Sequence, residues 1–254
     1  MLTEQYMMQS SAGLCSRRSG LPASERSRQY HSALQAHFDR PGFPCIGARV
    51  AVRRSSICMG LFDTLGSPGS AAALCADLAL FWQDLSACKH VFMSYVAVFE
   101  GPRIDDERHF EALLWKQLQA LHDHDAQHFP WDATVDADPS SADFAFSIAG
   151  KAWFVVGMNP TSERKARYLP FPALIFNARV QFEQLRRDGR YAPMQRAIRN
   201  LDKHFSGSIN SNLLGEGTSD SRQYAGRIVE NDWECPLHVH SSSQVAPVPG
   251  RDSD

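Results

Sequence analysis

The sequence has no apolar run approaching the roughly 20 residues that a membrane-spanning helix requires. It also has no marked charge of either sign, since its formal net charge is -2 over 254 residues. Such a balance gives no electrostatic reason to expect a nucleic-acid or membrane partner. The N-terminal residues lack the apolar segment of a secretory signal, so we expect a cytoplasmic protein.

Cysteine is sparse, and the motifs of several large enzyme classes are missing. The six cysteines are scattered and include no Cys-x-x-Cys pair, which excludes a disulfide scaffold and indicates free thiols in a reducing compartment. No G-x-x-x-x-G-K-[ST], G-x-S-x-G, H-E-x-x-H or G-x-G-x-x-G motif occurs. The common nucleotide-binding, hydrolase, zinc-protease and dinucleotide-binding classes are therefore not indicated.

The hydrophobic pattern that is present predicts an α+β fold. Apolar residues three and four apart predict helices over residues 24–38, 71–86, 105–122, 180–187 and 194–201. Apolar runs predict strands over residues 90–99, 144–148, 152–158 and 173–177, the middle two forming a hairpin. We expect one compact domain over residues 25–237, with a central, mostly antiparallel sheet packed with helices. Residues 60–69 are predicted to be a loop, and residues 1–24 and 238–254 to be disordered.

The first candidate for chemistry is the segment Phe43-Pro44-Cys45-Ile46-Gly47. A cysteine that ligates haem iron must present its sulfur on an exposed loop, with backbone N–H groups nearby and small neighbours. Pro44 stiffens the turn, and Gly47 leaves clearance for a macrocycle. Taken alone, the segment still favours a packed cysteine at a helix start.

The second candidate is a histidine-rich stretch in which His122, His124 and His128 alternate with Asp123 and Asp125. These residue types could hold a divalent metal. Because Phe129-Pro130 follows at once, the stretch is more typical of a polar helix end, where histidine is favourable without any ligand. A further interpretation places His122 or Asp125 at a pocket edge, in contact with substrate.

The third candidate is a basic segment that follows a predicted strand. Arg164 and Arg167 flank Lys165, and Arg179 follows the next apolar strand. Two arginines three residues apart suit bidentate binding of carboxylates, including haem propionates. A solvated basic turn explains the spacing equally well.

These segments occur together with further landmarks in a fixed order. The landmarks are Phe43-Pro44-Cys45, Trp115 to Asp125, Asp143 to Ser147, Gly150 to Val156, Asn159-Pro160, Phe176 to Arg179 and Gln223-Tyr224. In this order and spacing, residues 40–227 resemble the YqcI/YcgG family. The residues Ile46-Gly47 and Lys165-Ala166 differ from that family's usual pattern, and the stretch Trp233 to Pro236 does not match it.

The resemblance implies an enzyme that oxidises nitrogen. The family includes haem-dependent N-oxygenases, which hydroxylate a guanidine or convert an aminoimidazole to a nitroimidazole. Cys45 then becomes the expected axial ligand of haem b, supported by Phe43, Pro44 and Gly47. His122 and Asp125 are expected in the catalytic pocket. Arg164, Arg167 and Arg179 are expected to bind propionates or to serve the fold.

The same resemblance implies dioxygen or hydrogen peroxide as co-substrate, a small amine or guanidine as substrate, and an electron-donor protein or a homodimer as partner. Two other interpretations stay open. One is a non-haem metal-dependent oxidoreductase that uses His122, His124 and His128. The other is a haem-binding or haem-sensing protein without catalytic activity.

Overall fold

The computed structural model describes residues 5–88, 92–209 and 217–240, which contain one seven-stranded sheet. Its strands are β1 (Met7–Ser10), β2 (Gly13–Ser16), β3 (Ile57–Thr64), β4 (Ser94–Gly101), β5 (Phe146–Ile148), β6 (Lys151–Met158) and β7 (Ala173–Ala178). They lie in the order β2-β1-β3-β4-β7-β6-β5. The pair β3–β4 is parallel, and the other neighbouring pairs are antiparallel. The predicted single α+β domain with a mostly antiparallel sheet is confirmed.

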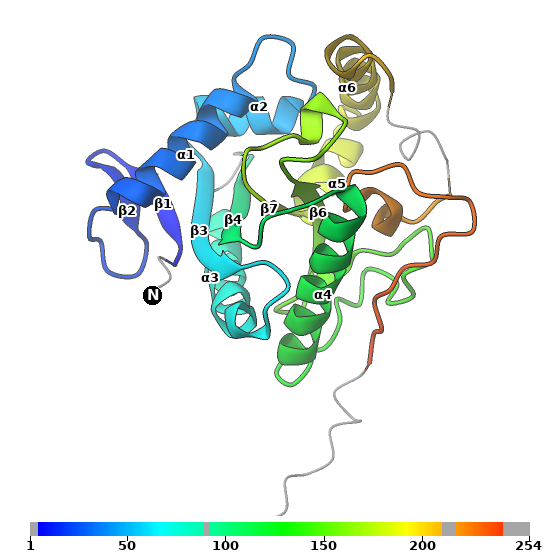
Figure 1. Ribbon diagram of the computed structural model, residues 1–254, viewed down its shortest axis with the longest axis horizontal. Coiled ribbons are helices and arrows are strands. Elements are labelled where there is room, and N and C mark those ends of the chain that lie inside the picture. Colours follow the sequence, from blue (N-terminus) through cyan, green and yellow to red (C-terminus); the bar gives the residue numbers. More distant parts are fainter. Residues whose placement is uncertain (1–4, 89–91, 210–216, 241–254) are drawn as a thin grey trace, which may run out of the picture.

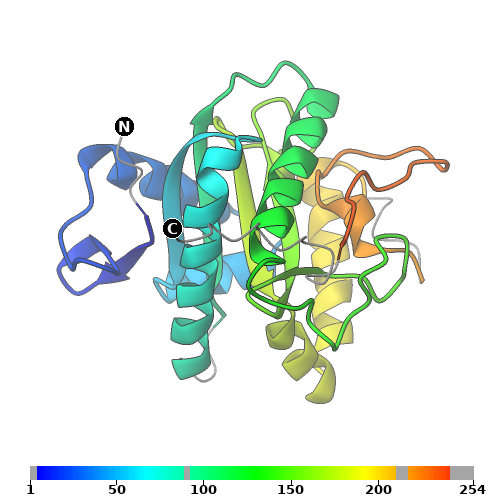
Figure 2. The ribbon, with the colours of Figure 1, turned by 90° about the horizontal axis from the view of Figure 1, so that it is seen from below.

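Helices cover both faces of this sheet (Figure 1). One face carries α3 (Ala71–Ala87) and α4 (Glu107–Asp125), which stand in front of the sheet in Figure 2. The opposite face carries α1 (Glu25–Phe38), α2 (Ile46–Arg53), α5 (Arg179–Arg187) and α6 (Tyr191–Ser206). Short 3₁₀ helices lie at η1 (Pro68–Ser70), η2 (Lys165–Arg167) and η4 (Asp220–Gln223). None of the described helices is long and apolar enough to cross a membrane.

The strands send alternate side chains to the two faces and so build two cores. On β4, Tyr95 and Phe99 belong to the core under α3 and α4, whereas Val96 and Val98 belong to the core under α1. The sheet therefore separates two sets of buried side chains. A residue on α4 and a residue on α2 lie on opposite sides of it.

The N-terminal segment is a correction to the sequence analysis, which expected residues 1–24 to be disordered. The structure places the hairpin β1–β2 there, at one end of the sheet. Tyr6 anchors it, because its backbone N–H donates to Asp77 at 2.9 Å and its hydroxyl donates to Asp84 at 2.6 Å. Four-residue strands carry too little alternation to be recognised, and these anchors are about 70 residues away.

The start of the predicted loop over residues 60–69 is also corrected, since β3 continues through Gly60 to Thr64. A Cβ atom on Gly60 would overlap the hydroxyl of Tyr95 on the neighbouring strand. Gly60 therefore marks a close approach inside the sheet rather than a turn. The expected disordered tail lies outside the described residues from residue 241 onward.

Candidate functional site

Cys45 occupies the N-cap position of α2, and its side chain is exposed. Its Sγ accepts a hydrogen bond from the backbone N–H of Ala48 at 3.4 Å. An N-cap is usually serine, threonine, aspartate or asparagine, whose oxygen satisfies the free N–H groups of the first helical turn. Here a reachable sulfur atom takes that place, beside the donors that would stabilise it as a thiolate.

The residues before Cys45 fix the position of the thiol. Phe43 is buried, and its ring packs 5.2 Å from that of His37, 5.4 Å from that of Phe38 and 5.7 Å from that of Phe205. The loop is thereby anchored both to α1 and to α6. Pro44 is buried as well, so the exposure within this segment begins at Cys45.

Gly47 keeps the space beside the thiol free. A Cβ atom on it would lie 3.4 Å from the ring of Phe92 and 4.0 Å from the Sγ of Cys45. Any larger side chain at Gly47 would fill the volume between that ring and the sulfur. That this space admits a macrocycle stays a prediction.

The surroundings of Cys45 shift the pKa of its thiol in two opposite directions. The side chain is exposed, but enough protein lies around it that burial raises the pKa of the thiol above its ordinary value. The N–H group of Ala48, the charge of Arg167 and the N–H group of Gly47 lower that pKa in part. The site therefore offers donors and a positive charge to a thiolate without making the free thiol strongly acidic.

Arg167 is the predicted arginine whose charge reaches Cys45. Its guanidinium donates to the carbonyl of Gly157 on β6 at 3.1 Å and to that of Gln223 at 3.2 Å. Burial and the neighbouring Arg164 lower its pKa to about 10, while Cys45 and then Asp202 act to raise it. Arg167 thus joins the end of β6 to the segment of Gln223, and from there its charge acts on Cys45.

The other two predicted arginines are held by protein partners. Arg164 is buried and pairs with Asp202 of α6 at 2.6 Å, and it also donates to the carbonyl of Ser208 at 3.0 Å. Arg179 pairs with Glu183 at 3.2 Å at the start of α5. Both arginines can be explained by the contacts they make within the fold.

The structure does not bring His122 and Asp125 together with Cys45. Both lie on α4, on the opposite face of the sheet from α2 (Figure 1). The Nε2 atom of His122 accepts from the N–H of His240 at 3.0 Å. Asp125 accepts from the N–H of Ala149 at 2.9 Å. Their sequence pattern is thus compatible with structural hydrogen bonds, and they share no pocket with the thiol.

The histidine-rich stretch forms no metal site within the described residues. The rings of His124 and His128 lie 5.3 Å apart near the end of α4, and His128 contacts the carbonyl of His124. Across residues 5–88, 92–209 and 217–240, no three His, Cys, Asp or Glu side chains are grouped to hold a metal ion. The arrangement agrees with a polar helix end.

The sequence analysis did not single out the aromatic residues on the Cys45 face of the sheet. Phe154 of β6 is half-buried, and its ring lies 6.4 Å from that of Phe182 on α5. Phe182 in turn lies 6.0 Å from Phe92, the neighbour of Gly47. Phe92 is thus the ring beside the thiol segment, and Phe182 and Phe154 extend a row of half-buried rings from it. Residues 152–158 were predicted as a strand, and the alternation of its side chains between the two faces of the sheet was the signal that could have indicated Phe154.

This arrangement fits a thiolate-ligated haem. Such a haem needs an exposed sulfur with backbone donors, and apolar side chains that are still reachable beside it. Cys45 with Ala48 meets the first requirement, and the half-buried ring of Phe92 beside Gly47 meets the second.

Comparisons with known proteins point in one direction. The model of the YqcI/YcgG family matches residues 30–238. The uncharacterized proteins YcgG and YqcI of Bacillus subtilis (strain 168) are 26% and 27% identical to the chain, over 78% and 77% of it and 82% and 80% of their own lengths. A protein of Streptomyces lavendulae named putative N(omega)-hydroxy-L-arginine synthase DcsA is 26% identical over 75% of each chain. No solved structure matches significantly.

Proposed function

Because the chain belongs to the YqcI/YcgG family, we propose that it is a haem-thiolate oxidoreductase that oxygenates a nitrogen atom of a small guanidine or amine. The observation that carries this proposal is the exposed thiol of Cys45 at the N-cap of α2. The name of the Streptomyces relative supports a guanidine as the first substrate to test.

In this proposal the sulfur of Cys45 would hold the haem iron, and the haem, when bound, would supply the chemistry that activates dioxygen or peroxide. The N–H groups of Ala48 and Gly47 stabilise negative charge on the sulfur, and the charge of Arg167 assists them. Hydrogen bonds to a ligating sulfur temper its electron donation and so set the reactivity of the iron.

The aromatic residues around the thiol have a second role. In this proposal the ring of Phe92, which packs against Phe182, would limit the access of water on one side of the Cys45 segment and so protect a reactive centre from wasteful side reactions. An oxygenation with dioxygen takes electrons and protons from a donor and releases water, whereas hydrogen peroxide carries its own oxidising equivalents.

The direct test is an absorption spectrum of protein loaded with haem, reduced under carbon monoxide. We expect a strongly red-shifted Soret band in the wild type that is lost in Cys45→Ser. Cys88→Ser is the matched control, because Cys88 is also exposed but ends α3 on the opposite face of the sheet. A band that survives in Cys45→Ser, or no Soret band in folded wild type, would sink the proposal.

A turnover assay separates an enzyme from a haem-binding sensor. L-arginine and other small guanidines and amines are incubated with the haem-loaded protein and either peroxide or a reductant with dioxygen. We expect a product that has gained an oxygen atom on nitrogen, detected by mass spectrometry and absent with Cys45→Ser. Haem bound through Cys45 without any product from the whole panel would favour the sensor.

A further inference from the structure

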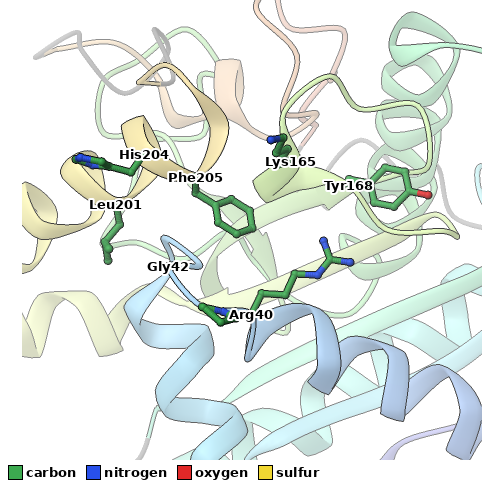
Figure 3. Close-up of a pocket in the computed structure, with 8 residues that line it drawn as sticks. Arg40, Gly42, Lys165, Tyr168, Leu201, His204 and Phe205 are labelled. Atoms are coloured by element: carbon green, nitrogen blue, oxygen red, sulfur yellow. The ribbon is translucent and has the colours of Figure 1, made fainter.

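A pocket of about 510 Å³ lies between three segments of the chain (Figure 3). The loop between α1 and α2 contributes Arg40, Pro41 and Gly42. The segment around η2 contributes Lys165 and Tyr168, and α6 contributes Leu201, His204 and Phe205. Phe205 also packs against Phe43 of the Cys45 segment, whereas the other lining residues have no role in the proposed site around Cys45.

The charges that line the pocket are all of one sign. Arg40 and Lys165 reach it from different segments, and no acidic residue is among its lining. Within the described residues, neither cation makes an ion pair, whereas the nearby Asp202 of α6 is paired with Arg164. The positive charge of Arg40 is strong enough to help burial lower the pKa of His37 on α1. Two uncompensated cations facing one pocket favour a bound anion.

The rest of the lining is largely apolar. The ring of Phe205 stands in the middle of the pocket in Figure 3, with Leu201 on the same helix. Phe205 packs edge-on against Phe43 at 5.7 Å, so this part of the pocket is fixed. A ligand that used the whole volume would therefore carry an apolar body as well as a negative charge.

We propose that this pocket binds a small organic acid, with its carboxylate between Arg40 and Lys165 and its apolar body against Phe205. The planar guanidinium of Arg40 can donate two parallel hydrogen bonds to a carboxylate, and the ammonium of Lys165 adds a point charge. This inference goes beyond the proposed function and does not depend on it. The proposal places a second ligand site on the face of the sheet that carries α1, α2, α5 and α6.

The experiment is titration calorimetry with benzoate as the probe, using full-length protein. Benzyl alcohol tests the need for the charge, and inorganic phosphate tests the need for the apolar body. We expect benzoate to bind, with an affinity that falls as salt is added, and both comparison compounds to bind at least about fivefold more weakly. Phosphate that binds as tightly as benzoate would overturn the organic-acid assignment.

Variants locate the binding site. Arg40→Gln and Lys165→Gln should each weaken benzoate by about fivefold, as expected for partly exposed charge pairs. Lys203→Gln is the control. Lys203 is an exposed cation on α6, the helix that carries Phe205, but it does not line the pocket. Equal loss in all three variants would indicate a general charge effect and reject the site.

The last arm separates this site from the haem site. Cys45→Ser should bind benzoate as the wild type does, even though it is expected to lose thiolate ligation. Haem-loaded wild type should also retain benzoate binding. If haem competes with benzoate, the pocket belongs to the cofactor and the proposal of a separate acid site fails, whatever the outcome for Cys45.

Discussion

The two faces of the sheet are covered in different ways. On one face, α3 buries seven residues and α4 buries nine, and their aromatic and aliphatic side chains interlock with the strands. On the other face, α1 buries five residues, but α2, α5 and α6 each bury a single residue, namely Ala51, Leu185 and Asp202. The first face supplies apolar burial that stabilises the fold. The second face keeps side chains reachable, and both proposed ligand sites lie there.

Strand β6 shows the contrast between neighbouring residues. Trp153 is fully buried on the α3 side, where its ring lies 5.9 Å from that of Phe81. Phe154 is the next residue on the strand and is only half-buried, although its ring still packs against that core at 5.9 Å from the ring of Tyr224. Two adjacent aromatic residues thus differ in how deeply they are buried.

The largest expected effect on stability tests the contrast between Trp153 and Phe154 on β6. Trp153→Ala should lower the free energy of unfolding by about 3–5 kcal/mol, because it opens a cavity in a packed core. Phe154→Ala should cost only about 1–2 kcal/mol, since this side chain is only half-buried and its loss exposes less apolar surface. Denaturant unfolding of haem-free protein measures both values. Equal losses would show that Phe154 is packed as tightly as Trp153.

How much of this fold could be predicted depends on how far apart in the sequence the interacting residues lie. Periodicity identified α1, α3, α4 and the β5–β6 hairpin because their apolar positions recur within a few residues. The hairpin β1–β2 was missed because its anchors, Asp77 and Asp84, are distant in sequence. The same limitation grouped His122 with Cys45, because a helical pattern does not reveal which face of the sheet the helix covers.

The position of Cys45 could be foreseen in part. The segment from Phe43 to Gly47 contains the proline and glycine that shape an exposed loop, and the resemblance to a family supplied the rest. The aromatic residues beside it come from β6, α5 and the segment before β4, so no local pattern unites Phe154, Phe182 and Phe92.

A second prediction sharpens the comparison, because each face carries a buried titratable group and the two respond to pH in opposite directions. On the α1 side, burial and then the charge of Arg40 lower the pKa of His37 to about 4. Neither of its ring nitrogens has a hydrogen-bond partner among the described residues. On the α4 side, burial raises the pKa of Asp125 to about 6, against the N–H of Ala149 and the charge of His128.

For His37, the unfolded chain binds a proton near pH 6.5 and the folded chain does so only near pH 4. Its stabilising contribution is present above pH 6.5 and is lost as the pH falls towards 4. For Asp125, the folded chain keeps a proton up to about pH 6, whereas the unfolded chain releases it near 3.8. That contribution is present below pH 3.8 and is lost as the pH rises towards 6.

The measurement is denaturant unfolding of His37→Phe and Asp125→Asn between pH 4 and 7. Relative to wild type, His37→Phe should gain about 2–3 kcal/mol as the pH falls, and Asp125→Asn should gain a similar amount as the pH rises. Differences from wild type that do not change with pH would show that these groups do not titrate as buried groups. If the stability of both variants relative to wild type changed with pH in the same direction, the pKa shift assigned to one of the two residues would be wrong.

The smallest expected effect concerns Cys45 in the absence of any ligand. Its Sγ caps α2 through the N–H of Ala48, and serine at an N-cap performs that task at least as well as cysteine. Because the side chain is exposed, Cys45→Ser also loses little apolar burial. Haem-free Cys45→Ser should therefore unfold within about 0.5 kcal/mol of the wild type. Folding alone does not require sulfur at this position, so a large loss of stability would give Cys45 a structural role and weaken the case that it is there to bind iron.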